Sequence, residues 1–289
     1  MTIHTMLDAV LQRKELSTVN DYAVVTDTMA YTDIDQVLPI FAEQFFFLDE
    51  IVPEKIKGAK ALEIGLGSGV LSIGAIKAGA AHVTALEINP RAKNTAGFNI
   101  VLNGVEDRIA IIDGNVDIFQ PVKGQKFDYI LSNPPFEPTP PDLDYFYHSA
   151  SGLYGLDFIE KIFQEVDEYL TEDGHLQIVT GAPGDSETPF MLVEMAEKYL
   201  SGSTTILLNK GTLNYARAIS WYPIKGFCGV GQANFMQQKA IEDGVTDYHL
   251  CVIHYEKGPK QVRVEPAKVV YENWYLPPEN EPEQESVLA

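Results

Sequence analysis

The sequence has few of the features that mark secreted, membrane-spanning or metal-binding proteins. Its only cysteines, Cys228 and Cys251, give neither a disulfide framework nor the spacing of a zinc site. The longest apolar runs, such as Phe45–Leu48, are far too short to cross a bilayer. The first residues do not form a secretory signal, and the six histidines show no metal-ligand spacing. These absences predict a soluble, cytoplasmic protein with no membrane segment and no metal site.

Positive charge is also scarce. The chain has 21 Lys and Arg residues against 41 Asp and Glu, for a net charge of −20. A protein that binds nucleic acid neutralises phosphates with a basic patch or run, and no such run occurs in this sequence. Because an acidic surface repels a polyanion, the charge balance argues against a nucleic-acid partner and favours a protein or a small molecule.

Apolar residues make up 45% of the chain, which is enough to bury a full core in one large domain. From Ala59 onward, short apolar runs alternate with helical periods, which is typical of a parallel sheet with crossover helices. We expect strands at Ala61–Ile64, Val83–Leu86, Ile109–Ile112, Tyr129–Leu131, Leu176–Val179, Thr205–Leu208 and His249–Tyr255. Helices are expected at Val70–Ala78, Pro90–Asn103, Ile159–Leu170 and Leu192–Tyr199, and a turn at Thr171–Gly174.

The regions on either side of this pattern differ from it. Residues 1–57 are predicted to form a helical lead-in or lid, with one helix through Met6–Leu11 and another beginning near Pro39. The main domain is assigned to residues 58–260, and residues 261–289 to an acidic C-terminal tail. Within the main domain, residues 211–247 interleave aromatic residues with glycines. For this stretch we favour an insertion that helps to form the substrate pocket over an additional piece of core.

A glycine-rich loop joins the first of these strands to its helix. Glycines are needed where the backbone turns tightly and approaches a ligand too closely for a Cβ. Gly65, Gly67 and Gly69 have the spacing Gly-x-Gly-x-Gly, whereas the dinucleotide fingerprint is Gly-x-Gly-x-x-Gly. Glu63, two residues before the first glycine, places a carboxylate where it suits an ammonium group and would repel a pyrophosphate. Both features argue against a nicotinamide cofactor.

Further acidic residues follow the second and third strands. Glu87 ends the second strand, where a carboxylate can accept hydrogen bonds from both hydroxyls of a ribose. After the third strand, Asp113 and Asp117 each offer a side chain to the exocyclic amine of an adenine. Position alone does not decide between these two aspartates.

Four residues, Asn133-Pro134-Pro135-Phe136, directly follow the fourth strand. An amide side chain, two prolines and an aromatic ring make a poor helix start and a rigid segment. The Asn133 side-chain oxygen and the Pro134 carbonyl can each accept one N–H bond, and Phe136 can stack on a planar group. The motif therefore predicts a clamp for a planar nitrogen, although Asn-Pro-Pro by itself is also compatible with a plain strand-end turn.

Together these segments resemble the class I S-adenosylmethionine-dependent methyltransferases: Glu63–Gly69, Glu87, Asp117–Phe119 and Asn133–Phe136. Within this class the chain is most similar to the release-factor glutamine N5-methyltransferase family, which has Asn-Pro-Pro-Tyr at the motif and Gly-Leu-Asp at the next helix, here Gly155–Asp157. The likeness covers about residues 59–182. It implies an α/β, Rossmann-like fold with a seven-stranded, mostly parallel sheet whose last strand is antiparallel, and S-adenosylmethionine as cofactor.

The resemblance also implies roles for individual residues. Cofactor contacts are assigned to Glu63, Gly65, Gly67, Gly69, Glu87, Asp117 and Asn133, and Asp117 is preferred to Asp113 by the family's register. Catalysis is assigned to Asn133, Pro134, Pro135 and Phe136. An amide nitrogen is a weak nucleophile, so we expect these residues to act by fixing it with its lone pair aimed at the sulfonium methyl group. No strong general base is required before the transfer.

Some features depart from that family. The N-terminal region is shorter, the family's C-terminal strand pair is not recognisable, and Phe136 replaces the more frequent Tyr. The main hypothesis is an N-methyltransferase that acts on a planar amide or amino nitrogen of a protein glutamine or of a small molecule. Two alternatives stay open, namely a nucleic-acid amino-group methyltransferase and a protein that uses S-adenosylmethionine itself as substrate or signal.

Overall fold

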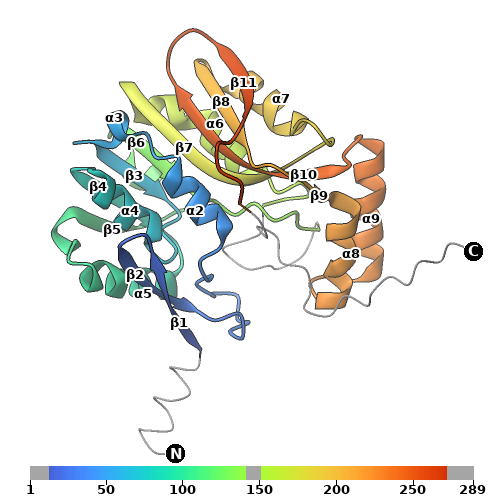
Figure 1. Cartoon of the computed structure of the whole chain (residues 1–289), viewed down its shortest axis with the longest axis horizontal. Coiled ribbons are helices and arrows are strands. Elements are labelled where there is room, and N and C mark those ends of the chain that lie inside the picture. Colours follow the sequence, from blue (N-terminus) through green and yellow to red (C-terminus); the bar gives the residue numbers. More distant parts are fainter. Residues whose placement is uncertain (1–12, 141–150, 272–289) are drawn as a thin grey trace, which may run out of the picture.

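A computed structural model of the chain describes residues 13–140 and 151–271 (Figure 1). The helix expected through Met6–Leu11 and the acidic residues after Pro277 lie outside these ranges. The strands of the central sheet are β3 Lys60–Ile64, β4 His82–Glu87, β5 Ile109–Asp113, β6 Phe127–Ser132, β7 Leu170–Gly184, β8 Ser203–Leu208, β9 Leu213–Asn214, β10 Asp247–Glu256 and β11 Gln261–Pro266.

These nine strands form one twisted sheet in the order β11-β8-β10-β7-β6-β3-β4-β5, and β9 pairs with β10. The neighbours from β7 to β5 are all parallel, whereas β10 is antiparallel to both β7 and β8. The expected Rossmann-like α/β fold is therefore confirmed, including the antiparallel last strand of the seven that we predicted. Strands β9 and β11 are additions to that set.

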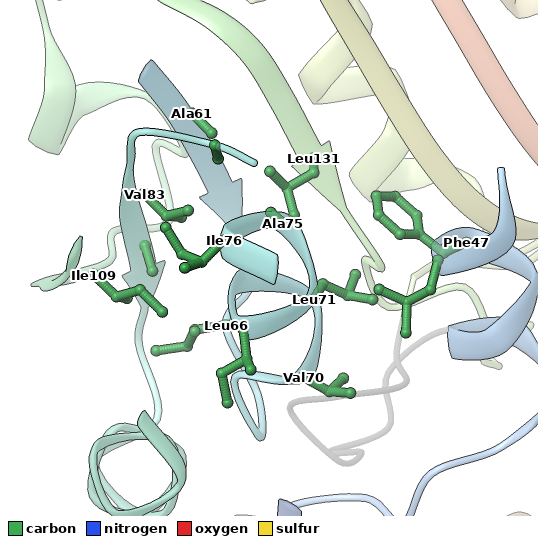
Figure 2. Close-up of a cluster of buried hydrophobic side chains, with 14 of the residues drawn as sticks. Phe47, Ala61, Leu66, Val70, Leu71, Ala75, Ile76, Val83, Ile109 and Leu131 are labelled. Atoms are coloured by element: carbon green, nitrogen blue, oxygen red, sulfur yellow. The ribbon is translucent and has the colours of Figure 1, made fainter. Parts of the chain in front are cut away.

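Helices cover both faces of the sheet. The helices are α2 Ala42–Asp49, α3 Pro53–Ile56, α4 Val70–Ala78, α5 Pro90–Leu102, α6 Asp157–Tyr169, α7 Phe190–Tyr199, α8 Tyr215–Lys225 and α9 Val230–Glu242. Successive strand residues point to opposite faces, so Ala61 joins the core beneath α2, α4 and α5, whereas Leu62 joins the core beneath α6 and α7. Figure 2 shows the first of these cores, where Leu71 and Ile76 of α4 lie near Val83 and Leu131.

The N-terminal region is not wholly helical, which corrects the prediction for residues 1–57. Strands β1 (Lys14–Val19) and β2 (Tyr22–Asp27) form an antiparallel hairpin in which Val19 pairs with Tyr22. The two-residue turn places Asn20 at a positive φ of 52°, a conformation that Asn tolerates. The residues of β2 from Tyr22 to Thr26 alternate between buried and half-buried positions, which is a strand pattern. The second predicted helix exists as α2 and begins at Ala42.

Two other expectations are corrected by the sheet. Residues 261–266, assigned to the tail, form edge strand β11 parallel to β8, because alternate Val262 and Val264 suit a pleated surface. The turn expected at Thr171–Gly174 lies within β7 instead. There the ladder jumps from the Phe127–Leu170 pair to the Tyr129–His175 pair, so these four residues bulge out of a continuous strand.

Residues 211–247 fold as an α8–α9 hairpin beside β9, at the right of Figure 1. The two helices bury their own apolar cluster, which includes Tyr215, Tyr222 and Met236. Phe136 packs against the same cluster from outside. The hairpin therefore has a small core of its own and lies against the segment that we predicted to clamp the acceptor.

Candidate active site

The glycine loop joins β3 to α4 in a conformation that favours glycine. Gly65, Gly67 and Gly69 have φ values of +79°, +54° and +83°, in the left-handed region where a Cβ is strained. A Cβ at Gly65 or Gly67 would meet nothing within 4 Å, so open space lies beside both residues. The loop is tied to the neighbouring strand, because the amides of Gly65 and Leu66 donate to the Leu86 carbonyl at 3.0 and 3.1 Å. The loop is therefore fixed in position by backbone hydrogen bonds, and the space beside Gly65 and Gly67 is open.

Glu63 lies at the end of β3 and is only 1% exposed. Burial raises the pKa of its carboxyl to about 8, and the nearby Glu87 adds to this rise, while the Ser72 hydroxyl donates to the carboxylate and opposes it. No Lys, Arg or His within the described ranges forms an ion pair with it. A buried carboxyl without a cation is costly when charged, so Glu63 suits a ligand that brings a positive charge.

Glu87 connects the second strand to the glycine loop. Its two carboxylate oxygens accept hydrogen bonds from the backbone amides of Gly67 and Asn89, both at 2.8 Å. Burial raises the pKa of Glu87, and these two amide bonds oppose the rise. The structure thus brings Glu63, the glycines and Glu87 together at the carboxyl ends of β3 and β4, where ligands of open α/β sheets bind.

The two aspartates that compete for the adenine differ in their surroundings. Asp113 ends β5 and forms an ion pair with Lys93. Asp117 is exposed in the turn that follows, where its backbone amide donates to the Asn115 side-chain oxygen at 3.3 Å. The carboxylate of Asp113 is therefore already engaged, which agrees with the preference for Asp117, although its role stays a prediction.

The motif Asn133–Phe136 begins directly after β6, at the same edge of the sheet. Ser132 pairs with Ile64 in the parallel ladder, and its hydroxyl donates to the Ile64 carbonyl at 2.7 Å. This places Asn133 one residue beyond β6, which is the neighbour of β3, whose next-to-last residue is Glu63. The Asn133 Oδ1 atom is buried and has no hydrogen-bond partner among the residues that the structure describes. An unpaired buried acceptor is unfavourable, so this atom is suited to receive an N–H group from a ligand.

The backbone at the end of the motif and just after it is held by tyrosines from distant parts of the chain. The Tyr248 hydroxyl, on β10, donates to the Phe136 carbonyl, and the Tyr222 hydroxyl, on α8, donates to the Pro138 carbonyl at 2.8 Å. A Cβ at Gly155, which has a φ of +76°, would lie 2.0 Å from the Phe136 oxygen. Gly155 therefore has to be a glycine for the two segments to approach this closely.

The sequence did not identify three of the residues around this site. Ser72 is the only polar residue in the first two turns of α4, Val70–Ile76, and that isolation was the available signal. Glu43 stands beside Gln44, before the phenylalanines of α2, so its burial had no local signal. Burial raises the pKa of Glu43 to about 7, with a small contribution from Glu137, which directly follows the motif. Tyr248 gave no signal, because its contact with Phe136 spans 112 residues.

Elsewhere, His175 and His254 hydrogen-bond each other at 2.9 Å on β7 and β10, toward the amino end of β7 and away from the motif. Within the described part of the chain, His, Cys, Asp and Glu side chains form no group of three or more that could hold a metal ion. No helix of residues 13–140 or 151–271 is long and apolar enough to cross a bilayer.

Comparison with known proteins agrees with this geometry. The family model of the methyltransferase small domain matches residues 44–197. A putative protein N5-glutamine methyltransferase of Methanocaldococcus jannaschii is 36% identical over 138 residues, which cover 46% of this chain and 68% of that protein. The release factor glutamine methyltransferase of Aquifex aeolicus is 32% identical over 141 residues, which cover 46% of this chain and 49% of that protein.

A solved structure shows the same fold. It is the S-adenosylmethionine-dependent methyltransferase from Agrobacterium tumefaciens, with a TM-score of 0.54 and 18% identity, covering 85% of this chain and 71% of that one. The chain spans about half the length of the Aquifex relative. The resemblance drawn from the glycine loop and the Asn-Pro-Pro-Phe motif is confirmed: the chain belongs to the methyltransferase small domain family and is an S-adenosylmethionine-dependent methyltransferase.

Proposed function

We propose that the enzyme transfers a methyl group from S-adenosylmethionine to the side-chain amide nitrogen of a glutamine in a protein. The observation that supports this most is the buried Oδ1 atom of Asn133, which has no hydrogen-bond partner among residues 13–140 and 151–271. Asn133 lies one residue beyond β6 and next to the Glu63 end of β3. An amide NH₂ group presents the N–H donor that this acceptor lacks. The names of the similar proteins, which refer to protein glutamine and to a release factor, agree with this acceptor.

The cofactor is proposed to lie along the carboxyl edge of β3 and β4. Glu63 would pair with its ammonium group, the backbone of Gly65, Gly67 and Gly69 would pass close to it, and Glu87 would accept from the ribose hydroxyls. Asp117 would contact the adenine amine, and Asn133 would lie at the methyl end. When bound, S-adenosylmethionine supplies a methyl group on a sulfonium centre. The buried Glu63 carboxyl and the open space beside two glycines fit this ligand.

The acceptor amide is proposed to be held by the motif. Asn133 Oδ1 and the Pro134 carbonyl each accept one N–H bond, which fixes the nitrogen and leaves its lone pair facing the methyl group. Pro134 and Pro135 keep the carbonyl direction rigid, and the half-buried Phe136 stacks on the amide plane. Catalysis then comes from positioning and preorganised dipoles. The proton leaves after transfer, when the nitrogen is cationic and acidic.

The net charge of −20 supports a protein acceptor over nucleic acid. A cytoplasmic location would suit an acceptor of the translation machinery such as a release factor, and it stays a prediction. Since the enzyme uses S-adenosylmethionine as methyl donor, the hypothesis of a sensor that only binds this ligand is no longer favoured.

The test is methyl transfer to a release factor from labelled S-adenosylmethionine, with the modified residue located by mass spectrometry. Asn133→Ala should lower kcat at least roughly a hundredfold, the usual effect of losing a preorganised polar group, and should change the affinity for S-adenosylhomocysteine far less. Asn94→Ala, at an exposed position on α5, is the matched control and should behave like the wild type. Methylation of another residue type, or full turnover by Asn133→Ala, would contradict the proposal.

A further inference from the structure

The α8–α9 hairpin is attached by hydrogen bonds along its length to segments that follow the predicted acceptor clamp. Near its tip, Tyr222 donates to the Pro138 carbonyl at 2.8 Å. Near its base, Tyr215 donates to the Leu153 carbonyl at 3.1 Å, and Tyr154 donates to the Asp243 carboxylate at 2.6 Å. A part held in this way keeps a fixed position relative to Asn133–Phe136, and anything bound to its tip would be placed next to the clamp.

The tip of the hairpin, residues 223–230, exposes apolar side chains. Ile224, at the end of α8, is 74% exposed, and Val230, at the start of α9, is 64% exposed. The two lie on either side of the turn 226–229, in which Gly226 has a φ of +77°. Single exposed apolar residues are common on protein surfaces, but these two lie at the end of a projecting element and next to a backbone contact with the clamp region.

The charge of the hairpin is opposite to that of the rest of the protein. The chain has 41 acidic residues, yet none occurs between Tyr199 and Ile241. That stretch contains four cationic residues, Lys210, Arg217, Lys225 and Lys239. Lys239 is neutralised by Glu242 and Asp243 at the base, whereas Lys225 is exposed at the tip. A lysine in the last turn also suits the helix dipole, but this does not explain why acidic residues are missing from the whole stretch.

From these observations we infer that the tip of α8–α9 is the docking surface for the methyl-accepting protein, which presents an apolar side chain flanked by acidic residues. The inference rests on the proposed function, because it assigns the acceptor protein a second contact beside its glutamine. An apolar anchor with a rim of complementary charge is the usual composition of a specific protein interface. An RNA partner would use Lys225 without needing Ile224 or Val230.

The experiment compares tip variants on two substrates. Ile224→Glu and Val230→Glu reverse the apolar contact, and Ile241→Glu, at an equally exposed position of 72% near the base, is the matched control. With an intact release factor as substrate, the tip variants should raise KM at least roughly tenfold and leave kcat near the wild-type value. With a short peptide containing the same glutamine, all three variants should match the wild type, because the peptide does not reach the tip.

The outcomes separate this inference from the proposed function. If the wild type modifies neither the release factor nor the peptide, the proposed acceptor is wrong. If it modifies the release factor and the tip variants keep the wild-type KM, the docking surface is wrong while the proposed function stands. Salt-sensitive RNA binding that Lys225→Glu abolishes and Ile224→Glu preserves would overturn the inference in favour of a nucleic-acid contact.

Discussion

Binding of the cofactor should release a proton from Glu63. Burial raises the pKa of this carboxyl to about 8 in the absence of ligand, so it is about 90% protonated at pH 7. The ammonium group of S-adenosylmethionine or S-adenosylhomocysteine favours the charged carboxylate and should return its pKa toward the ordinary range. Only the deprotonated fraction is ready for the ligand. That fraction grows from about 1% at pH 6 to about 9% at pH 7, which predicts a roughly tenfold gain in affinity.

Isothermal titration calorimetry with S-adenosylhomocysteine measures this directly, because the product analogue binds without turnover. In two buffers of different ionisation enthalpy, the heats at pH 7 should report release of about 0.9 proton per site. Glu63→Gln should bind more weakly and lose the pH dependence of affinity between pH 6 and pH 7. Glu43→Gln is the matched control: it removes another buried carboxyl whose pKa is raised, to about 7, and should keep the linkage. Proton uptake, or equal affinities at pH 6 and pH 7, would refute the ammonium role of Glu63.

Three further predictions concern neighbouring residues. Ser72→Ala removes the hydroxyl that opposes the raised pKa of Glu63, so calorimetry at pH 7 should show an affinity lower by a few-fold and a proton release closer to one. Without ligand, the free energy of unfolding measured with urea should fall as pH rises from about 5 to 8. The reason is that the buried carboxyls of Glu63 and Glu43, whose pKa values are raised, are tolerated in the fold only while they are protonated. Glu43→Gln should reduce this slope and raise the free energy of unfolding by roughly 1–3 kcal/mol at pH 8. In thermal melts, Gly155→Ala should destabilise the fold by about 1–3 kcal/mol, and it should also lower kcat, because its Cβ would clash with the carbonyl oxygen of the motif's last residue. Gly211→Ala, with a φ of +91° and no neighbour within 4 Å, should show only the smaller cost of backbone strain in the same melts.

The central sheet was predictable because its signals are local. Each of the strands β3 to β6 is a short apolar run with a polar or glycine boundary, and parallel strands buried on both faces read in this way. The start of α5 was equally local: Asn89 caps the helix through its side chain and Pro90 occupies the first position. Since the glycine loop follows one such strand directly, its position at the edge of the sheet followed from the same signals.

The β1–β2 hairpin and α8 were missed for a different reason. At the N-terminus, the helical period near Met6–Leu11 does not continue into residues 14–27, where the alternation fits strands. No helix was expected in residues 211–247, where aromatic residues are interleaved with glycines, yet α8 forms there with Pro223 inside its last turn. Tertiary contacts compensate there: Tyr222 reaches Pro138, and the apolar faces of α8 and α9 bury each other. Packing overrides local propensity where a segment has a partner that its own sequence does not reveal.

The same distinction divides the proposed active site into two parts. Its cofactor half consists of residues close to their own strand ends, so a carboxylate and three glycines at the right spacing were enough to indicate the ligand. Its acceptor half depends on distant residues: Tyr248 of β10 and Tyr222 of α8 hold the Phe136 and Pro138 carbonyls, and Gly155 lets a loop approach Phe136 closely. A motif alone can indicate that a planar nitrogen is held, because that depends on two acceptors and a ring. Which molecule presents the nitrogen depends on what surrounds the motif, and in this chain a cationic helical hairpin with an apolar tip occupies that position.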